Sequence, residues 1–558
     1  MVQCANPITF KYIITNFIKK HKFLFVCYLI LVLLVPLQDV GIPHIVGLLT
    51  KNIQKKASIY VPLTLLIVLT IVIQVGSIIN GLIDVKMFPA FQQFVREIII
   101  SHIMKESKTN YEELRTGELS MNLHKLPTML YSYIEDMRDM IIPQFIVFSV
   151  SIIYFSYYDI RIGLGLMAVI ILLFFSVSYT IDKCEPVSTS RDNQYNLMME
   201  EITDVFKNMT SVLNANTETR EIQRNDEFQQ DYYKLVHKSL MCSYRVRYYL
   251  IPFVLGFFAW TLNRMYSFVK TGKIKSHTMV SLVLILLYLM KSMWIVIYNL
   301  KDQVFRWGTI QASFKVLNNC APEEKSTYTP SENTPDGFYM EHVTYKYDGR
   351  KEIFSDLNLN IVPNKKTLIV GEIGSGKSTL IKLLMKYQVP EDGMIYYNRT
   401  PYSKISVEKI REIIGYVPQT PMLFNRTIYE NIVYNNTSIT KEQVLELMYK
   451  FGLGEMLKKF PEGLDTNVGN GGTKLSGGQR QIVWILRVML QNPEVVILDE
   501  PTSALDEGTK PIVQNMLENI IQNKTTIMIT HDQYLYKMAD TIVELKNGKV
   551  VSIKNNTE

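Results

Sequence analysis

The sequence predicts an all-α membrane domain of six helices, followed by an α/β domain built around a phosphate-binding loop. Three features support this fold class. Long apolar runs are confined to the N-terminal half, a glycine-rich loop at residues 371–378 joins a strand-like run to a helix-like run, and a hydrophobic strand-like run ends in Asp499 and Glu500. At 558 residues, the chain is also too long for a single compact domain.

Six segments are apolar over the about 20 residues that a helix needs to cross a bilayer. They cover approximately residues 23–49, 61–83, 141–158, 162–181, 248–269 and 278–300. A buried core helix can be apolar on every face, but six such segments in one half of a chain favour membrane spans. A cleaved secretory signal is disfavoured, because no small-residue cleavage site closes the first apolar run.

Connector lengths and composition define the domains. The connectors at residues 91–140 and 191–247 are long and of helical composition, whereas the others are short, so we expect two helical extensions on one side of the membrane. Residues 318–336 are rich in Pro, Ser, Thr, Asn and Glu and predict a linker between domains at residues 1–317 and 337–558. No internal repeat is visible, so the chain is expected to be one half of a pair.

Charge and cysteine content exclude some classes of function. The net charge of +7 is scattered over the chain without basic runs interleaved with aromatic residues, so no nucleic-acid partner is expected. The five cysteines lie far apart and have no zinc-ligand spacing. We therefore expect free, inert thiols rather than a disulfide framework.

The glycine-rich loop reads Gly371-Glu-Ile-Gly-Ser-Gly-Lys377-Ser378 and lies between a strand-like and a helix-like run. Its backbone N–H groups and the following helix N-terminus suit nucleotide phosphates. Lys377 is expected to reach the β- and γ-phosphates, and Ser378 to ligate Mg²⁺. The candidate ATP-binding residues here are Gly371, Glu372, Ile373, Gly374, Ser375, Gly376, Lys377, Ser378 and Thr379.

The run Val495-Val-Ile-Leu-Asp499-Glu500 predicts a buried strand that ends in two carboxylates. Asp499 is expected to hold Mg²⁺ through water, and Glu500 to orient and deprotonate the attacking water. A buried strand followed by a solvated acid pair is the alternative, and the phosphate loop upstream disfavours it.

Between these two motifs lies Leu475-Ser-Gly-Gly-Gln479, and residues 338–551 resemble the nucleotide-binding domain of ABC transporters. The resemblance implies that Tyr347 stacks on adenine, that Gln419 in Tyr-Val-Pro-Gln senses Mg²⁺, and that His531 contacts the γ-phosphate. The motif Leu475–Gln479 is called the signature of this family. The resemblance also implies that this signature and a dimer-contact loop, Ser503-Ala-Leu-Asp506, complete the ATP site of a second subunit. The residues implied to contact that nucleotide are Ser476, Gly477, Gly478, Gln479 and Asp506.

The N-terminal domain resembles the six-helix domain of exporter-type ABC proteins more loosely, through its connectors and Thr116-Gly-Glu-Leu119. Coupling segments are placed at residues 120–131 and 203–217. Asn470 stands where such exporters usually have an acid, which puts one coupling contact in doubt. Because the C-terminal domain would use cytosolic ATP, the long connectors and the N-terminus of this multi-pass membrane protein are expected on the cytosolic side. In an organellar membrane this would be the matrix-equivalent side, and the sequence does not say which membrane holds the chain.

These features together predict ATP-driven export, or lipid flipping, of an unidentified substrate by a dimer of half-transporters. A homodimer is favoured and a heterodimer is the alternative. An ATP-gated channel or regulatory membrane protein, and less so a non-transport ABC ATPase, are competing functions. Polar residues within the spans are candidate pathway groups, because lipid exposure would be costly. They are Gln38, Asp39, His44, Gln74, Asn80, Lys291 and Asn299.

Overall fold

A computed structural model of the chain describes residues 7–106, 116–318, 337–347, 351–503 and 505–556. The chain separates into two compact units. We call the described residues up to Asn318 the helical unit and those from Gly337 onward the α/β unit, and we describe each by itself. The predicted linker at residues 318–336 lies almost entirely outside the described residues.

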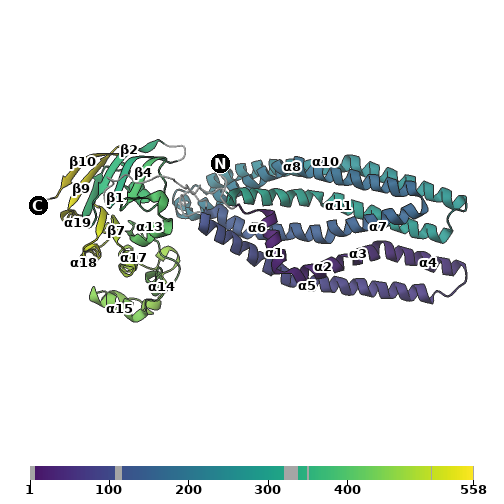
Figure 1. The fold of residues 1–558 in the computed structure, drawn as a ribbon, viewed down its shortest axis with the longest axis horizontal. Coiled ribbons are helices and arrows are strands. Elements are labelled where there is room, and N and C mark those ends of the chain that lie inside the picture. The colour runs from purple at the N-terminus through teal and green to yellow at the C-terminus, as the bar shows by residue number, and fades with distance from the viewer. Residues whose placement is uncertain (1–6, 107–115, 319–336, 348–350, 504, 557–558) are drawn as a thin grey trace. The chain divides into compact units, whose positions relative to one another are not determined.

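The helical unit is a bundle of long helices (Figure 1). Its first segments are α1 (Phe10–Lys20), α2 (Lys22–Val32), α3 (Leu34–Pro36), the π-helical η1 (Leu37–Gly41), α4 (Ile42–Gln54) and α5 (Tyr60–Glu106). There follow α6 (Thr116–Asp136), the π-helical η3 (Met137–Ile141), α7 (Ile142–Tyr158), α8 (Ile160–Lys207), α9 (Met209–Asn214), α10 (Glu218–Lys270) and α11 (Ser276–Leu317). The α4–α5, α7–α8 and α10–α11 connectors all lie at one end of this bundle (Figure 1).

Both π-helical segments have the same local cause. Each ends two residues before a proline, Pro43 after η1 and Pro143 after η3. Proline has no N–H to give to the carbonyl four residues earlier, so the helical ladder opens locally and takes up an extra residue. In each of these two spans, the proline therefore determines where the irregular turn lies.

Five helical segments in the described residues are long and apolar enough to cross a membrane: Lys22–Gln54, Tyr60–Lys105, Leu119–Tyr158, Ile160–Lys207 and Ser276–Leu317. Five of the six predicted spans fall within them. The remaining one, residues 248–269, lies in α10, which is not among the five. Asn263 and Arg264 interrupt its apolar stretch. This sixth span therefore stays a prediction.

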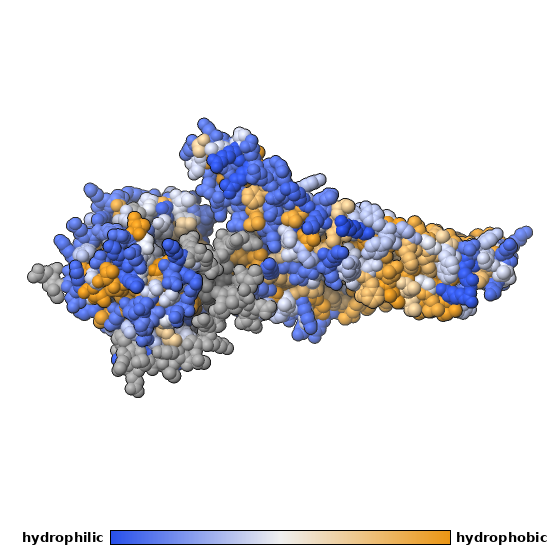
Figure 2. All heavy atoms as spheres, turned by 90° about the horizontal axis from the view of Figure 1, so that it is seen from above, coloured by the Kyte–Doolittle hydropathy of each residue, from blue (hydrophilic) through white to orange (hydrophobic). Residues whose placement is uncertain are grey.

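The outward surface of these helices is apolar. On α5, Val61, Leu65, Ile71 and Ile78 are all about half exposed or more. Figure 2 shows hydrophobic side chains gathered along the bundle, with hydrophilic side chains towards its ends. A continuous apolar surface of this kind is rare on proteins in water, and it is what a lipid environment requires.

Cys184 and Cys242 correct the prediction that the cysteines are free thiols. They form a disulfide that joins α8 to α10, with their Cα atoms 5.8 Å apart. The two cysteines are 58 positions apart in the sequence, so their pairing could not be predicted from it. They meet because α8 packs against α10 in the bundle. Cys27 is a free thiol among the described residues.

The two predicted coupling segments differ in structure. Residues 203–217 contain a chain reversal, where α8 ends, the short helix α9 follows and α10 begins. Residues 120–131 instead lie inside α6, where Leu126 and Leu130 are fully buried within the helical unit. The connector between α5 and α6 falls at residues 107–115, outside the described part.

The α/β unit contains two sheets. One is antiparallel, in the order β2 (Glu352–Ile361), β1 (Phe338–Lys346), β4 (Asp392–Tyr397) and β5 (Thr400–Pro401). The other has the order β10 (Lys549–Asn555), β9 (Thr541–Lys546), β3 (Lys366–Gly371), β8 (Thr525–Ile529), β7 (Val495–Asp499) and β6 (Ile414–Val417), and its strands other than β10 run parallel. The carboxyl ends of β3, β8 and β7 therefore lie side by side at one edge, where ligands of open α/β sheets bind.

Helices complete this unit: α12 (Lys377–Leu384), α13 (Val407–Ile413), α14 (Ile428–Ile432), α15 (Lys441–Lys450), α16 (Gly454–Lys458), α17 (Gly477–Gln491), α18 (Lys510–Ile521) and α19 (Gln533–Lys537). Strands β7 and β8 are buried along almost their whole length, as the continuous hydrophobic run before Asp499 predicted.

Candidate functional site

The glycine-rich loop connects β3 to α12, as predicted. Gly374 and Gly376 have φ angles of +83° and +103°, which favour glycine because it has no Cβ. A Cβ on Gly376 would also lie 2.7 Å from the ring of Phe354. Gly376 is the N-cap of α12, so the loop presents backbone N–H groups and a helix N-terminus together.

Lys377 and Ser375 lie within this loop. The Lys377 ammonium donates hydrogen bonds to the carbonyl oxygens of Gly371 and Glu372, at 2.7 and 3.0 Å. Ser375 is buried, and its hydroxyl has no hydrogen-bond partner among the described residues. A buried hydroxyl without a partner is unfavourable. This loop is therefore suited to an added group with acceptor oxygens.

Asp499 lies at the carboxyl end of β7. Tyr416, on the neighbouring strand β6, donates its hydroxyl hydrogen bond to Asp499 Oδ2 at 3.2 Å. Burial raises the pKa of the Asp499 carboxyl, and the hydrogen bond from Tyr416 opposes that rise. Tyr416 was not among the predicted site residues, although it belongs to the Tyr-Val-Pro-Gln motif that singled out Gln419.

Glu500 and His531 come together after β7 and β8. The His531 Nε2 atom lies 3.6 Å from Glu500 Oε1, and the His531 side chain is 81% exposed whereas that of Glu500 is 17% exposed. Glu500 has a φ of 47°, and its N–H bonds the carbonyl of Ile529 at 2.7 Å. Left-handed backbone at a non-glycine residue is unfavourable, so the hydrogen bond from the Glu500 N–H helps to hold this conformation.

The other predicted residues occupy separate positions in this unit. Ser476 is the N-cap of α17, and it forms a capping box with Gln479. The Asp506 carboxylate accepts from the N–H of Thr509 at 2.7 Å, while Ala504 in the same loop lies outside the described residues. Gln419 is exposed at the end of β6. The ring of Tyr347 packs edge-on against that of Tyr345.

The structure thus places Lys377, Asp499, Glu500 and His531 at one edge of the parallel sheet. The oxygen donors of Ser378 and Asp499 suit Mg²⁺, which prefers hard oxygen ligands together with those of substrate phosphates. The buried Ser375 hydroxyl and the glycine backbone leave room and donors for the phosphates. The residues present therefore fit a Mg²⁺–nucleotide complex.

In the helical unit, the predicted pathway residues fall into different settings. Asp39 in η1 is buried, whereas Gln74 and Lys291 are exposed. Asn299 donates a hydrogen bond to the carbonyl of Ile295 in its own helix. His44 is paired with Tyr154 of α7, with 2.9 Å between Nδ1 and the hydroxyl oxygen.

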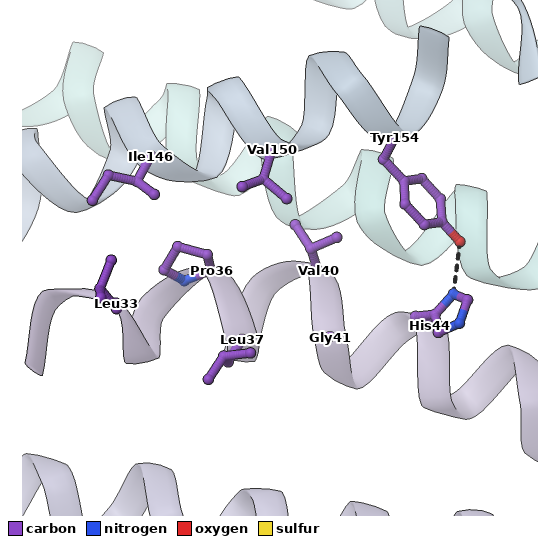
Figure 3. A pocket seen from close by; sticks show the side chains of 9 residues that line it. All are labelled: Leu33, Pro36, Leu37, Val40, Gly41, His44, Ile146, Val150 and Tyr154. Carbon is purple, nitrogen blue, oxygen red and sulfur yellow. Dashed lines mark hydrogen bonds between the residues drawn. The ribbon is translucent and has the colours of Figure 1, made fainter. Parts of the chain in front are cut away.

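Figure 3 shows this pair at one end of a largely apolar hollow between α3–α4 and α7. Its volume is about 440 Å³, and it is lined by Leu33, Pro36, Leu37, Val40, Gly41, His44, Ile146, Val150 and Tyr154. The irregular turn at η1 forms part of its wall. Of the predicted pathway residues, His44 is the one that lines it.

A second polar group in the helical unit has the form of an ion-pair network. Asp84, Glu135 and Asp139 have carboxylate oxygens close enough to share a metal ion. However, Arg138 bonds both oxygens of Asp84, at 2.7 and 3.0 Å, and also pairs with Asp139. The guanidinium already supplies the positive charge that a metal ion would bring, so we assign this group no metal.

A glycine-rich loop between a strand and a helix, beside a buried strand that ends in two carboxylates, defines a P-loop nucleotide-binding domain. Comparison with known proteins shows which family of nucleotide-binding domains it resembles. Residues 354–503 match the ABC transporter family.

Three curated relatives match part of this chain. P-glycoprotein 14 of Caenorhabditis elegans is 38% identical over 221 residues, which is 39% of this chain and 17% of that protein. The mitochondrial iron-sulfur clusters transporter ABCB7 of Homo sapiens is 35% identical over 230 residues, 41% of this chain and 31% of that protein. The mitochondrial iron-sulfur clusters transporter ATM1 of Saccharomyces cerevisiae is 38% identical over 224 residues, 39% of this chain and 32% of that protein. The aligned stretch thus spans less than a third of each relative.

A solved structure of a bacterial Atm1-family ABC exporter with ATP bound matches with a TM-score of 0.81 and 21% identity, over 96% of this chain and 95% of that one. At this identity the likeness concerns the fold. Residues 354–503 therefore match an ABC transporter domain, and over nearly its whole length the chain shares the fold of that bacterial exporter structure.

Proposed function

We propose that the chain is one subunit of a dimeric membrane exporter or lipid flippase driven by ATP binding and hydrolysis. The observation that carries this proposal is the convergence of Lys377, Asp499, Glu500 and His531 at one sheet edge, in a chain with an exporter fold. Glu500 and His531 lie 3.6 Å apart beside Asp499, which supports a hydrolytic role more than nucleotide binding alone.

Each residue has a definite task in hydrolysis. The N–H groups of the glycine-rich loop and Lys377 bind the β- and γ-phosphate oxygens, and Tyr347 stacks on adenine. Ser378, Asp499 and Gln419 would hold Mg²⁺, which neutralises charge that develops on the phosphates. Glu500 orients the attacking water and accepts its proton, and His531 donates a hydrogen bond to the γ-phosphate.

The dimer supplies the second half of each ATP site. Ser476, Gly477, Gly478 and Gln479 open α17, and the helix N-terminus there offers N–H groups to the γ-phosphate bound by the partner subunit. ATP then holds two subunits together, and hydrolysis releases them, which shifts the population between two conformations of the membrane helices. Both Glu500 and His531 are present, so two copies of this chain would form two competent sites.

The α/β unit and the long connectors are placed on the cytosolic side, where ATP is available. The curated relatives bear names as different as P-glycoprotein and iron-sulfur clusters transporter, so we propose no particular cargo. His44 and Tyr154 are proposed pathway residues, since they place two polar groups in an apolar hollow between membrane helices.

The test is ATP hydrolysis by the purified chain in lipid nanodiscs, with Glu500→Gln beside wild type. We expect the wild type to hydrolyse ATP and the variant to lose about 10²–10⁴-fold in rate, the range for loss of a general base. Glu518→Gln is the matched control, because Glu518 is exposed on α18. Screening lipids, peptides and thiol conjugates for stimulation identifies the cargo class.

ATP binding without any turnover in the wild type would contradict active transport by this chain alone. It would favour a regulatory role or an obligate, different partner subunit. Equal rates for wild type and Glu500→Gln would exclude Glu500 as the general base.

A further inference from the structure

The Asp499 carboxylate is held by a tyrosine from the neighbouring strand. Tyr416 of β6 lies opposite Ile497 of β7 in parallel register. Side chains alternate between the two faces of a strand, so Tyr416, Ile497 and Asp499 share one face of the sheet. The Tyr416 hydroxyl reaches along this face and donates to Asp499 Oδ2 at 3.2 Å. Among the described residues no other group donates to this carboxylate, so its Oδ1 atom is left without a donor.

The backbone that carries Tyr416 is fixed by helix α17. The indole N–H of Trp484 donates to the Tyr416 carbonyl at 2.8 Å, and the side-chain amide of Gln481 donates to the Pro418 carbonyl at 3.3 Å. Trp484 and Gln481 are three residues apart, so they lie on the same face of this helix. The two carbonyls flank Val417, so the end of β6 is bound to α17 on both sides of that residue.

Trp484 is itself held in place by a buried arginine. The Cζ atom of Arg487 lies 4.4 Å from the centroid of the Trp484 ring. Arg487 is buried, and its Nε–H group donates to the carbonyl of Asn431 at 2.7 Å. Packing and hydrogen bonds of this kind lock a side chain into one rotamer, which is what precise placement of a functional group requires. The phenol of Tyr416 therefore projects from a backbone with rigid support behind it.

We propose that Tyr416 is a positioning residue for Mg²⁺, whose hydroxyl fixes the Asp499 carboxylate so that Oδ1 stays available to the water shell of the ion. This proposal rests on the proposed function, in which Asp499 holds Mg²⁺ through water. A carboxylate at a strand end can rotate about its side-chain bonds, and each rotation moves the oxygen that would meet the ion. The Tyr416 hydrogen bond restricts this rotation in advance, so less conformational freedom is lost on binding.

A purely structural role for Tyr416 leads to a different expectation. A phenol that only satisfies a partly buried carboxylate would, on removal, lower the melting temperature and affect nucleotide binding equally with and without Mg²⁺. A positioning residue changes only the part of the binding that depends on the ion. The ratio of the nucleotide affinity in Mg²⁺ to that in EDTA, which we call the magnesium ratio, therefore separates the two roles.

The main variant is Tyr416→Phe in the full chain, which keeps the ring and removes the hydroxyl. Tyr397→Phe is the matched control, because the Tyr397 hydroxyl also donates to a carboxylate, that of Glu494, at 3.0 Å. Glu494 precedes β7, at the opposite end of this strand from Asp499. Trp484→Phe is the second variant, since it keeps an aromatic ring and removes the N–H that holds the Tyr416 carbonyl.

Binding of AMP-PNP, a nucleotide that resists hydrolysis, is measured by calorimetry on the chain in lipid nanodiscs. We expect the magnesium ratio of Tyr416→Phe to fall about tenfold or more, the lower end of the effect when a group that orients a metal ligand is removed. Its affinity in EDTA should stay at the wild-type value, and Tyr397→Phe should keep the wild-type ratio. An unchanged ratio in Tyr416→Phe, or an equal fall in Tyr397→Phe, would overturn the proposal.

Trp484→Phe tests the support behind the tyrosine. Its magnesium ratio should fall by less than that of Tyr416→Phe, because the hydroxyl is still present but its backbone is held less firmly. In the double variant Trp484→Phe should add nothing to the loss, since both changes act through the same hydroxyl. Higher Mg²⁺ should also restore the rate of ATP hydrolysis in Tyr416→Phe, which a purely structural role would not predict.

The positioning role and the proposed function fail in different ways. A wild type that binds AMP-PNP more tightly in Mg²⁺ but does not hydrolyse ATP would contradict the proposed function, and a lowered ratio in Tyr416→Phe would still support the positioning role. A wild type that hydrolyses ATP and has the same magnesium ratio as Tyr416→Phe would leave the proposed function standing and overturn the positioning role.

Discussion

The two units of this chain hold their charged groups in different ways. In the α/β unit, Lys377, Asp499, Glu500 and His531 follow three parallel strands and stand at the end of a sheet, partly open to solvent. In the helical unit, Lys125, Arg191, Asp192 and Thr309 lie inside a bundle and join α6, α8 and α11. The first arrangement keeps charge available for a ligand, whereas in the second Lys125, Arg191 and Thr309 surround one carboxylate oxygen of Asp192. Polar groups that open to one side of a sheet can bind a ligand, whereas enclosed groups that contact one another hold helices together.

This comparison predicts its largest effect at Lys377. Lys377→Ala removes the cation expected at the phosphates, and we expect ATP hydrolysis to fall by about 10²–10³-fold or more, as when one group that stabilises developing charge is lost. Thermal unfolding of the full chain should hardly change. Steady-state hydrolysis and a melting curve in detergent test both parts. A large drop in melting temperature would mean that Lys377 stabilises the fold, which would contradict the difference between the two units.

The converse prediction concerns Asp192, whose side chain is 3% exposed and accepts from Thr309 at 3.0 Å. Asp192→Ala leaves Lys125 and Arg191 buried without their partner, which we expect to lower the free energy of unfolding by about 3–5 kcal/mol. Asp231→Ala, in the exposed pair with Lys234, is the control, at about 0–1 kcal/mol. Denaturant titration of the detergent-solubilised chain measures both. Equal stability of the two variants would break the comparison.

The disulfide sharpens the contrast further, because it adds a covalent link to the enclosed region. Cys184→Ala should lower stability under oxidising conditions by about 2–4 kcal/mol, since a bridge over 58 residues restricts the unfolded chain. Under reducing conditions wild type and variant should become alike, apart from the loss of one buried sulfur. Mass spectrometry of peptides prepared without reductant shows whether Cys184 and Cys242 are linked. Free thiols in the native chain would contradict the prediction.

The smallest effect is expected at an exposed pair of the α/β unit. Asp356 accepts a hydrogen bond from His342 and raises the pKa of His342 above its usual value of 6.5. The folded state therefore binds a proton more tightly than the unfolded state, so the pair adds stability below about pH 6.5, and this is lost as the pH rises through the raised pKa. His342→Gln should melt slightly earlier than wild type at pH 6 and alike at pH 8.5. A larger difference in melting temperature between the two proteins at pH 8.5 than at pH 6 would contradict this prediction.

Much of the candidate nucleotide site could be predicted from the sequence because its motifs are local. The turn itself requires the positive φ angles of Gly374 and Gly376, and the β-branched hydrophobic run before Asp499 favours a buried strand. The parallel sheet then brings the carboxyl ends of β3, β7 and β8 together, which is a general property of such sheets. Tyr416 and Asp532 were not predicted, because the residues that they contact, Asp499 and Thr502, lie 83 and 30 positions away in the sequence.

The sequence by itself determined the order of the two units, five of the six predicted apolar segments able to span a membrane, and the glycine-rich loop between β3 and α12. Only the tertiary structure decided that Cys184 joins Cys242, that residues 120–131 lie within α6, and that Asp532 contacts Thr502. Hydropathy and phosphate-loop geometry act over a few consecutive residues, so their patterns survive in the linear chain. Pairing between helices depends on which faces meet after packing, and that is fixed by the whole bundle rather than by any one segment.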